Sequence, residues 1–311
     1  MSRAHESRLD SSIIVPFVIF TLVWGSTWLV IRGQIDTVAP FWSVTYRFAM
    51  AAVAMAAVAY WKGHSLRPNP GLLVAATILG ICQFCINFSS VYVAERYITS
   101  GIVATVFAIL LVPNSLLAWA MLGQRPSGRF ALGGMLAAAG IGLLFLNEVR
   151  VSTATSSQVL AGLGFTLIGL LGASFANVYQ ARKSAQRHPL LALLAWAMAI
   201  GTMADAVLAY AFAGPPTIDM SLNYWLGLTY LALAASVLCF SLYFPVVRKI
   251  GPGRAAYSSV LVPVIAMGLS TMFEDYRWSL IAAAGGLLAL GGMLVALSGN
   301  RGSKIAAPDA G

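Results

Sequence analysis

Apolar residues occur in runs of about twenty, and this spacing constrains the fold more than any other feature of the chain. A helix needs ~20 apolar residues to cross a hydrocarbon core, and helices keep every backbone hydrogen bond inside the segment. Ten runs bounded by glycine, proline or charge are therefore predicted to be transmembrane helices: 13–31, 41–61, 72–93, 98–122, 130–146, 160–179, 190–212, 224–247, 255–273 and 278–297.

The composition supports this assignment. Of the 311 residues, 59% are hydrophobic and only 9% are charged, which leaves too little charge to cover the surface of a water-soluble domain. The predicted fold class is an all-α integral membrane protein with ten transmembrane helices.

Lysine and arginine are divided unevenly between alternate loops. With a cytoplasmic N-terminus, fourteen lie in cytoplasmic segments and four in external loops, while Arg47 lies inside a predicted helix. Because cytoplasmic loops carry the excess of basic residues, both termini are predicted to be cytoplasmic. The basic residues form no continuous face, so the net charge of +9 does not indicate nucleic-acid binding.

The second half of the chain repeats features of the first. Matching positions are Pro40 and Arg47 with Pro189 and Trp196, 111–113 with 261–263, and Gly133, Gly134 and Gly140 with Gly285, Gly286 and Gly292. One unit has five helices, so the second copy must enter the membrane from the opposite side. The predicted organisation is a cytoplasmic tail (1–12), a five-helix repeat (13–147), an external linker (148–159), an inverted five-helix repeat (160–298) and a cytoplasmic tail (299–311).

Several short motifs carry a resemblance to a known family. They are Trp24-Gly25-Ser26, the Pro40…Arg47 pair, Tyr97-Ile98-Thr99-Ser100 leading to Pro113, the Gly123-Gln124-Arg125 turn, and Gly251-Pro252-Gly253-Arg254 leading to Pro263. With these motifs the chain resembles the drug/metabolite transporter superfamily, in its ten-helix EamA-type branch. The family usually has glutamate where Gln124 stands.

The resemblance implies a secondary transporter that exports or exchanges small metabolites by alternating access, without nucleotide hydrolysis. Bacterial amino-acid exporters, including the aromatic amino-acid type, look most similar in length and aromatic content. We therefore expect a carrier of amino acids or similar amphipathic metabolites in a bacterial inner membrane. A drug or other metabolite carrier of the same fold is the alternative, and an integral membrane enzyme is disfavoured because the acidic residues are dispersed over tails and loops.

Polar side chains within the predicted helices are candidates for a substrate cavity, since they are costly in lipid. Gln83, Asn87 and Ser90 share one face of the third helix. Related positions on other helices extend the set of predicted substrate contacts to Ser26, Ser174, Asn177 and Tyr243. One shared cavity would explain these positions. Hydrogen bonds between helices, each worth ~0.6 kcal/mol, are the alternative.

Aromatic residues complete the predicted site. Stacking walls for an organic substrate could be formed by Trp24, Trp28, Tyr46, Trp196, Tyr243 and Tyr257, although tryptophan and tyrosine also anchor helices at the membrane interface. Pro113 and Pro263 lie within predicted helices, where each removes a backbone hydrogen bond, and are predicted to act as a hinge or gate.

Arg47 is also included among the predicted substrate contacts. It could pair with Asp205, bond helix-end carbonyls or bind a substrate carboxylate. Asp205 is the only acidic residue within a predicted helix, which favours facilitated diffusion or exchange over strong proton coupling.

No motif for catalysis, a metal or a cofactor occurs in the sequence. Cys82 and Cys85 form a C-x-x-C pair without a second pair of ligands nearby, and Cys239 stands alone. The glycines of the fifth and tenth helices predict close packing within a monomer. The expected partners are a small-molecule substrate and the lipid bilayer.

Overall fold

The computed structural model describes residues 11–124, 127–151, 155–255 and 258–298, and all regular structure in these ranges is helical. The helices of the first half are α1 (Ser11–Ile35), α2 (Pro40–Trp61), α3 (Pro70–Leu79), η1 (Gly80–Asn87), α4 (Phe88–Ala94), α5 (Ser100–Phe107), η2 (Ala108–Leu110), α6 (Leu111–Leu122) and α7 (Gly128–Val151). Those of the second half are α8 (Ser156–Gln180), α9 (Lys183–Gln186), α10 (Leu190–Ala213), α11 (Leu222–Thr229), η3 (Tyr230–Leu238), α12 (Cys239–Ile250), α13 (Pro252–Ala255), α14 (Ser258–Phe273) and α15 (Leu280–Ser298).

A helix lies at each of the ten predicted positions. Within the described ranges, seven helical stretches are long and apolar enough to cross a membrane: Ile13–Ile35, Pro40–Trp61, Pro70–Ala94, Ser100–Leu122, Ser156–Gln180, Leu190–Ala213 and Leu222–Ile250. The other three apolar helices are shorter: Gly128–Leu144, Leu261–Phe273 and Leu280–Val295.

The third and eighth of these stretches each contain a π-helical segment, which the sequence did not predict. The third runs as α3, η1 and α4, and the eighth as α11, η3 and α12. A π-helix bonds residue i to residue i+5, so its turn is wider than an α-helical turn. The Ser236 hydroxyl shows the same spacing, because it donates to the Leu231 carbonyl at 2.8 Å.

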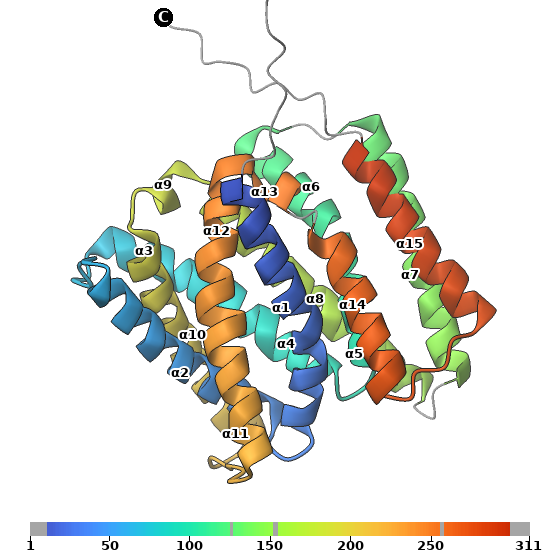
Figure 1. The fold of residues 1–311 in the computed structure, drawn as a ribbon, viewed down its shortest axis with the longest axis horizontal. Coiled ribbons are helices and arrows are strands. Elements are labelled where there is room, and N and C mark those ends of the chain that lie inside the picture. Colours follow the sequence, from blue (N-terminus) through green and yellow to red (C-terminus); the bar gives the residue numbers. More distant parts are fainter. Residues whose placement is uncertain (1–10, 125–126, 152–154, 256–257, 299–311) are drawn as a thin grey trace, which may run out of the picture.

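The bundle has two ends, called here the upper and lower faces as they appear in Figure 1. Helix α1 begins and α15 ends at the upper face, while α1 ends and α11 begins at the lower face (Figure 1). Local sequence signals set several helix starts. Proline is the first residue of α2 and of α3, where its missing N–H costs nothing. Thr155 and Gln158 form a capping box at the start of α8.

Glycine residues allow several helices of the two halves to approach closely. Helices α7 and α15 lie side by side at one edge of the bundle (Figure 1), where a Cβ on Gly140 would lie 2.5 Å from the Gly285 carbonyl oxygen. On the other side α10 packs along α2, and α14 packs on α1 and α5. The predicted packing of the glycine tracks within one chain is confirmed by these contacts.

Candidate substrate cavity

A cavity of about 120 Å³ lies in the middle of the bundle between the two halves. The first half contributes residues of α1, α2, η1, α4, α5 and η2, and the second half contributes residues of α8, α12 and α14. The lining residues are Trp24, Thr27, Trp28, Ile31, Arg47, Gln83, Asn87, Phe88, Val91, Ala104, Phe107, Leu110, Ala173, Asn177, Phe240, Tyr243, Ser258, Val262 and Pro263.

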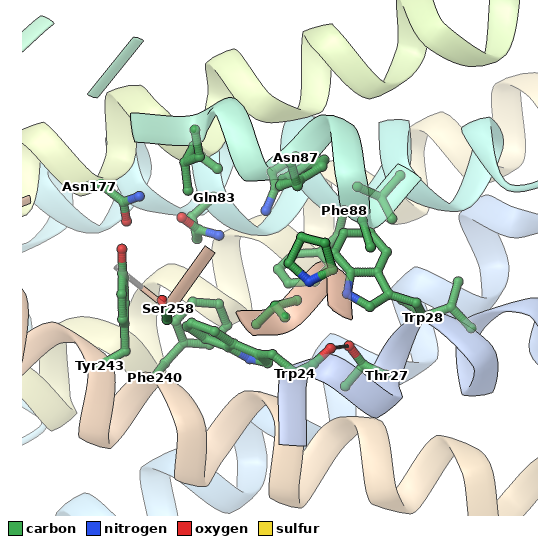
Figure 2. A pocket seen from close by; sticks show the side chains of 18 of the residues that line it. Trp24, Thr27, Trp28, Gln83, Asn87, Phe88, Asn177, Phe240, Tyr243 and Ser258 are labelled. Carbon is green, nitrogen blue, oxygen red and sulfur yellow. Dashed lines mark hydrogen bonds between the residues drawn. The ribbon is translucent and has the colours of Figure 1, made fainter. Parts of the chain in front are cut away.

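Three amide side chains are the principal uncharged polar groups of this cavity. Gln83 and Asn87 come from η1 and Asn177 comes from α8, and all three are buried. Their side-chain oxygens have no hydrogen-bond partner in the described structure. Figure 2 shows the amides of Gln83 and Asn87 directed toward the same space. A buried amide oxygen without a partner costs free energy, so these three oxygens are available to accept hydrogen bonds from a ligand.

One wall of the cavity is aromatic. Trp24 contacts Tyr243 with ring centroids 4.9 Å apart and Phe240 at 5.5 Å, so rings from both halves form one surface (Figure 2). The Trp24 indole N–H donates to the Ala235 carbonyl in η3 at 3.0 Å, which fixes the ring. Trp28 and Phe107 extend the apolar lining, with centroids 5.3 Å apart. Such a wall suits a flat or apolar group.

Arg47 is the single charged residue of the lining. It is 1% exposed; its Nε donates to Ser236 Oγ at 3.1 Å and its Nη1 to Tyr92 Oη at 3.3 Å. The guanidinium carbon lies 4.4 Å from the centre of the Phe88 ring. The structure brings Arg47 together with the predicted contacts Trp24, Gln83, Asn87, Asn177 and Tyr243, and with Pro263.

Arg47 and Asp205 do not bond to each other. Asp205 is 0% exposed and its Oδ1 accepts a hydrogen bond from Ser89 Oγ at 2.6 Å. Of the open alternatives for Arg47, the direct pair with Asp205 is therefore excluded in this conformation.

Other predicted contacts lie outside the lining. The Ser26 hydroxyl bonds to the Tyr230 hydroxyl at 2.7 Å, and the Tyr46 hydroxyl donates to the Thr217 carbonyl at 3.0 Å. The Trp196 indole donates to the Leu66 carbonyl at 3.0 Å, so Trp196 joins the halves near the upper face. Ser174 is buried beside the lining residue Ala173, and Pro113 is in α6 away from the cavity. Tyr257 lies outside the described residues.

Several lining residues were not selected as substrate contacts in the sequence. Thr27 and Ile31 follow Trp24 by three and seven residues, so helical periodicity from Trp24 could have found them; Trp28, one of the predicted stacking walls, does line the cavity. Phe88 could not be found this way. An α-helical face starting at Gln83 includes Asn87, Ser90 and Val91 but not Phe88. The wide turn of η1 is consistent with Phe88 entering the lining, from which Ser90 is absent.

The lower end of the cavity is closed by contacts between the halves. Glu274, after α14, accepts hydrogen bonds from Ser100 Oγ at 2.5 Å and from Ser270. Ser270 Oγ also accepts from the Gly101 N–H at 2.9 Å. Ser100 and Gly101 lie one helical turn before Ala104 in α5, and Ala104 lines the cavity.

Glu95, beyond the end of α4, lies beside this closure. It is 0% exposed, and both of its carboxylate oxygens lack a hydrogen-bond partner in the described structure. Its backbone carbonyl accepts from Arg32. Burial raises the pKa of Glu95 well above its ordinary value; Glu274 adds to the rise, and Arg32 and Arg47 oppose it. Glu95 was not selected as a functional residue in the sequence because its burial depends on tertiary packing.

The upper end of the cavity lies beside the ends of two helices of the second half. Asn177 lies three residues before the end of α8 at Gln180, and Ser258 is the first residue of α14. The cavity therefore extends from one turn inside the lower closure to the last turn of α8 and the first turn of α14.

The model of the EamA-like transporter family matches residues 11–146 and, separately, residues 160–298. The chain belongs to the EamA-like transporter family. It is therefore a multi-pass membrane transporter and not an enzyme, and the resemblance to the drug/metabolite transporter superfamily is confirmed.

Curated relatives agree with this assignment. The chain is 30% identical to the uncharacterized inner membrane transporter YedA of Escherichia coli K12, over 80% of this chain and 79% of that protein. It is 26% identical to the protein PagO of Salmonella typhimurium LT2, over 85% and 84% of the two chains. A probable amino-acid metabolite efflux pump of E. coli K12 is 22% identical over 96% and 98%.

The fold also matches that of a solved crystal structure with a TM-score of 0.68. That alignment covers 94% of this chain and 99% of the other, with 19% sequence identity. It therefore supports the arrangement of the helices.

Proposed function

We propose that this EamA-family transporter exports or exchanges amino acids or similar small amphipathic metabolites by alternating access. The observation that carries the proposal is the central cavity, which combines an aromatic wall, three partnerless amides and one guanidinium drawn from both halves. Such a surface suits a molecule with an apolar part and a polar or charged part. The name of one relative, a probable amino-acid metabolite efflux pump, supports the same cargo class.

Alternating access requires two halves that move around the cavity. We propose that 13–147 and 160–298 are inverted repeats joined by an external linker at 148–159, with short tails at 1–12 and 299–311. Support comes from the two separate family matches and from π-helical segments in the third helical stretch of each half. The closure at Glu274 and Ser100 is one gate. Pro263, in the lining, is a candidate hinge of α14, and Pro113 occupies the matching place in α6.

The proposed location is a bacterial inner membrane, with the upper face and both termini in the cytoplasm. The distribution of lysine and arginine supports this orientation, and the relative YedA is an inner membrane transporter. In this orientation the closure at Ser100 and Glu274 lies on the external side of the cavity, as expected of an exporter ready to load.

Drug or other metabolite efflux by the same fold is the second candidate function. The apolar walls of Trp24, Trp28 and Phe240 favour it, because an apolar drug needs few polar contacts. Counterflow in liposomes containing the purified full chain separates the candidates. Labelled amino acids should exchange under the first function, and exchange of cationic dyes or nucleobases without amino acids would support the second.

A further inference from the structure

The buried guanidinium of Arg47 bonds to no carboxylate among the described residues, and Glu95 interacts with it only at longer range. Both hydrogen-bond acceptors of its guanidinium, Ser236 and Tyr92, are neutral hydroxyls. In the described part of the chain no carboxylate forms an ion pair with it, and the buried Asp205 is bonded to Ser89 instead. An ionised group at this depth is costly unless an opposite charge approaches it.

The guanidinium is held in one orientation. The Ser236 hydroxyl donates to the Leu231 carbonyl at 2.8 Å, so its lone pairs are free to accept from Arg47 Nε. The Phe88 ring lies against the guanidinium on one side at 4.4 Å. Arginine presents five N–H donors in a planar fork, and these contacts engage two of its nitrogens. The geometry therefore leaves donors for a planar anion.

The amides nearby supply the complementary groups. Gln83 and Asn87 line the same cavity, and their side-chain oxygens lack a partner among the described residues. A guanidinium beside partnerless amide acceptors matches the carboxylate and ammonium groups of an α-amino acid. The aromatic wall of Trp24, Phe240 and Tyr243 then faces the remainder of the molecule (Figure 2).

We propose that Arg47 binds the carboxylate of the transported molecule, while Gln83 and Asn87 receive its ammonium group. The cargo class is α-amino acids with an apolar or aromatic side chain. This inference rests on the proposed transport function and specifies how the cavity of that function selects its substrate.

Matched pairs of ligands test the subsite without any mutation. The pairs are L-phenylalanine with 2-phenylethylamine, L-tryptophan with tryptamine, and L-leucine with 3-methylbutylamine, each pair differing by the carboxylate. Binding to the full chain in detergent is measured by calorimetry, because amines leak across liposomes. Loss of a hydrogen bond to a charged group weakens binding by about ten- to a hundredfold, so each amine should bind that much more weakly than its amino acid.

Variants locate the effect at Arg47. Arg47→Gln should remove the preference for the amino acid over the amine, whereas Ser236→Ala should reduce the preference only in part. Arg187→Gln is the matched control, since Arg187 is exposed and distant from the cavity lining. If Arg47→Gln does not fold, the ligand pairs on the unmodified chain still decide the question.

The outcomes separate the subsite from the function. Equal binding of amine and amino acid overturns the role of Arg47, even if liposomes show amino-acid counterflow. Failure of all three amino acids to bind also overturns it. Counterflow in liposomes of labelled amino acids, cationic dyes and nucleobases then tests the proposed transport function independently of the role of Arg47.

Discussion

Three buried amides with partnerless side-chain oxygens lie together at the cavity. Asn87 and Asn177 are 4% and 2% exposed, and neither side-chain oxygen is bonded in the described structure. A protein gains no stability from such groups, because their desolvation is not repaid by a hydrogen bond. At the lining, these oxygens are free to accept hydrogen bonds from cargo or water.

Replacing either residue by leucine should therefore impair transport and spare folding. We expect Asn87→Leu or Asn177→Leu to lower the transport rate at low substrate concentration about tenfold, the usual effect of one hydrogen bond. Counterflow in liposomes measures the rate, and expression and melting temperature report folding.

Asn114 provides a matched control for that experiment. It is 0% exposed and both polar side-chain atoms lack partners in the described structure, but it does not line the cavity. Asn114→Leu should leave transport unchanged. If Asn87→Leu and Asn177→Leu also transport normally, the amides do not contact cargo.

At the scale of helices, the sequence predicted the ten positions but not their internal geometry. Length and apolarity determine whether a segment crosses a membrane, so these signals suffice to find the helices. The π-helical turns in η1 and η3 depend on tertiary contacts, and no composition or spacing signal marked them. The predicted face of the third stretch included Ser90, but the cavity is lined by Phe88 and not by Ser90. Gln83 and Asn87, which lie within η1, do line the cavity.

Trp196 shows a second reason why the site was only partly predictable. Its depth within a helix suggested a cavity wall, but the indole bonds to the Leu66 carbonyl in the loop between α2 and α3. Sequence spacing gives the depth of a residue along a helix and does not give the rotation of that helix. Rotation is set by neighbours such as α2, along which α10 packs.

The contact between α7 and α15 makes a prediction about stability. An added Cβ at Gly140 would lie 2.5 Å from the backbone oxygen of Gly285, so Gly140→Ala should force the helices apart. Overpacking of this kind costs about 1–3 kcal/mol, which should lower the melting temperature in detergent.

Gly142→Ala is the control for this substitution. A Cβ at Gly142 meets nothing within 4 Å, so alanine there should be neutral or stabilising by up to ~1 kcal/mol through its higher helix propensity. Equal melting temperatures for the Gly140 and Gly142 variants would contradict a tight contact between these helices.

At the scale of the whole molecule, the closure at the lower face should respond to pH. The pKa of Glu95 is raised by burial in this closed conformation, and opening would return it toward about 4.3. The closed state therefore holds the proton more tightly. The free energy by which protonated Glu95 favours the closed state is fully present below the ordinary pKa of glutamate. It is lost as the pH rises through the raised pKa of Glu95.

Labelling of a cysteine at Thr99 from the lower face should accordingly speed up as the pH rises, relative to a cysteine at the exposed Thr37. Normalising to Thr37→Cys removes the pH dependence of the thiol itself. Glu95→Gln should abolish the change in the ratio. A ratio that varies with pH equally in both backgrounds would show that another group controls opening.

The proposed orientation predicts which face is accessible in intact cells. A cysteine replacing Ser156, at the start of α8, should react with an impermeant reagent applied outside, and a reporter fused after Ser298 should be cytoplasmic. Labelling at Ser156 only after the cells are opened would reverse the orientation.

The seam between α7 and α15 has a symmetry of its own. A Cβ on Gly292 would meet Gly133 and Ala137, just as one on Gly140 would meet Gly285 and Ala289. Gly133 matches Gly285 and Gly140 matches Gly292 in the two halves. Exchanging the halves therefore turns the contact between Gly140 and Gly285 into the contact between Gly292 and Gly133. This reciprocity defines an isologous interface, the kind formed by two identical subunits about a twofold axis. A single five-helix unit carrying one such glycine track would be complementary to a second copy of itself.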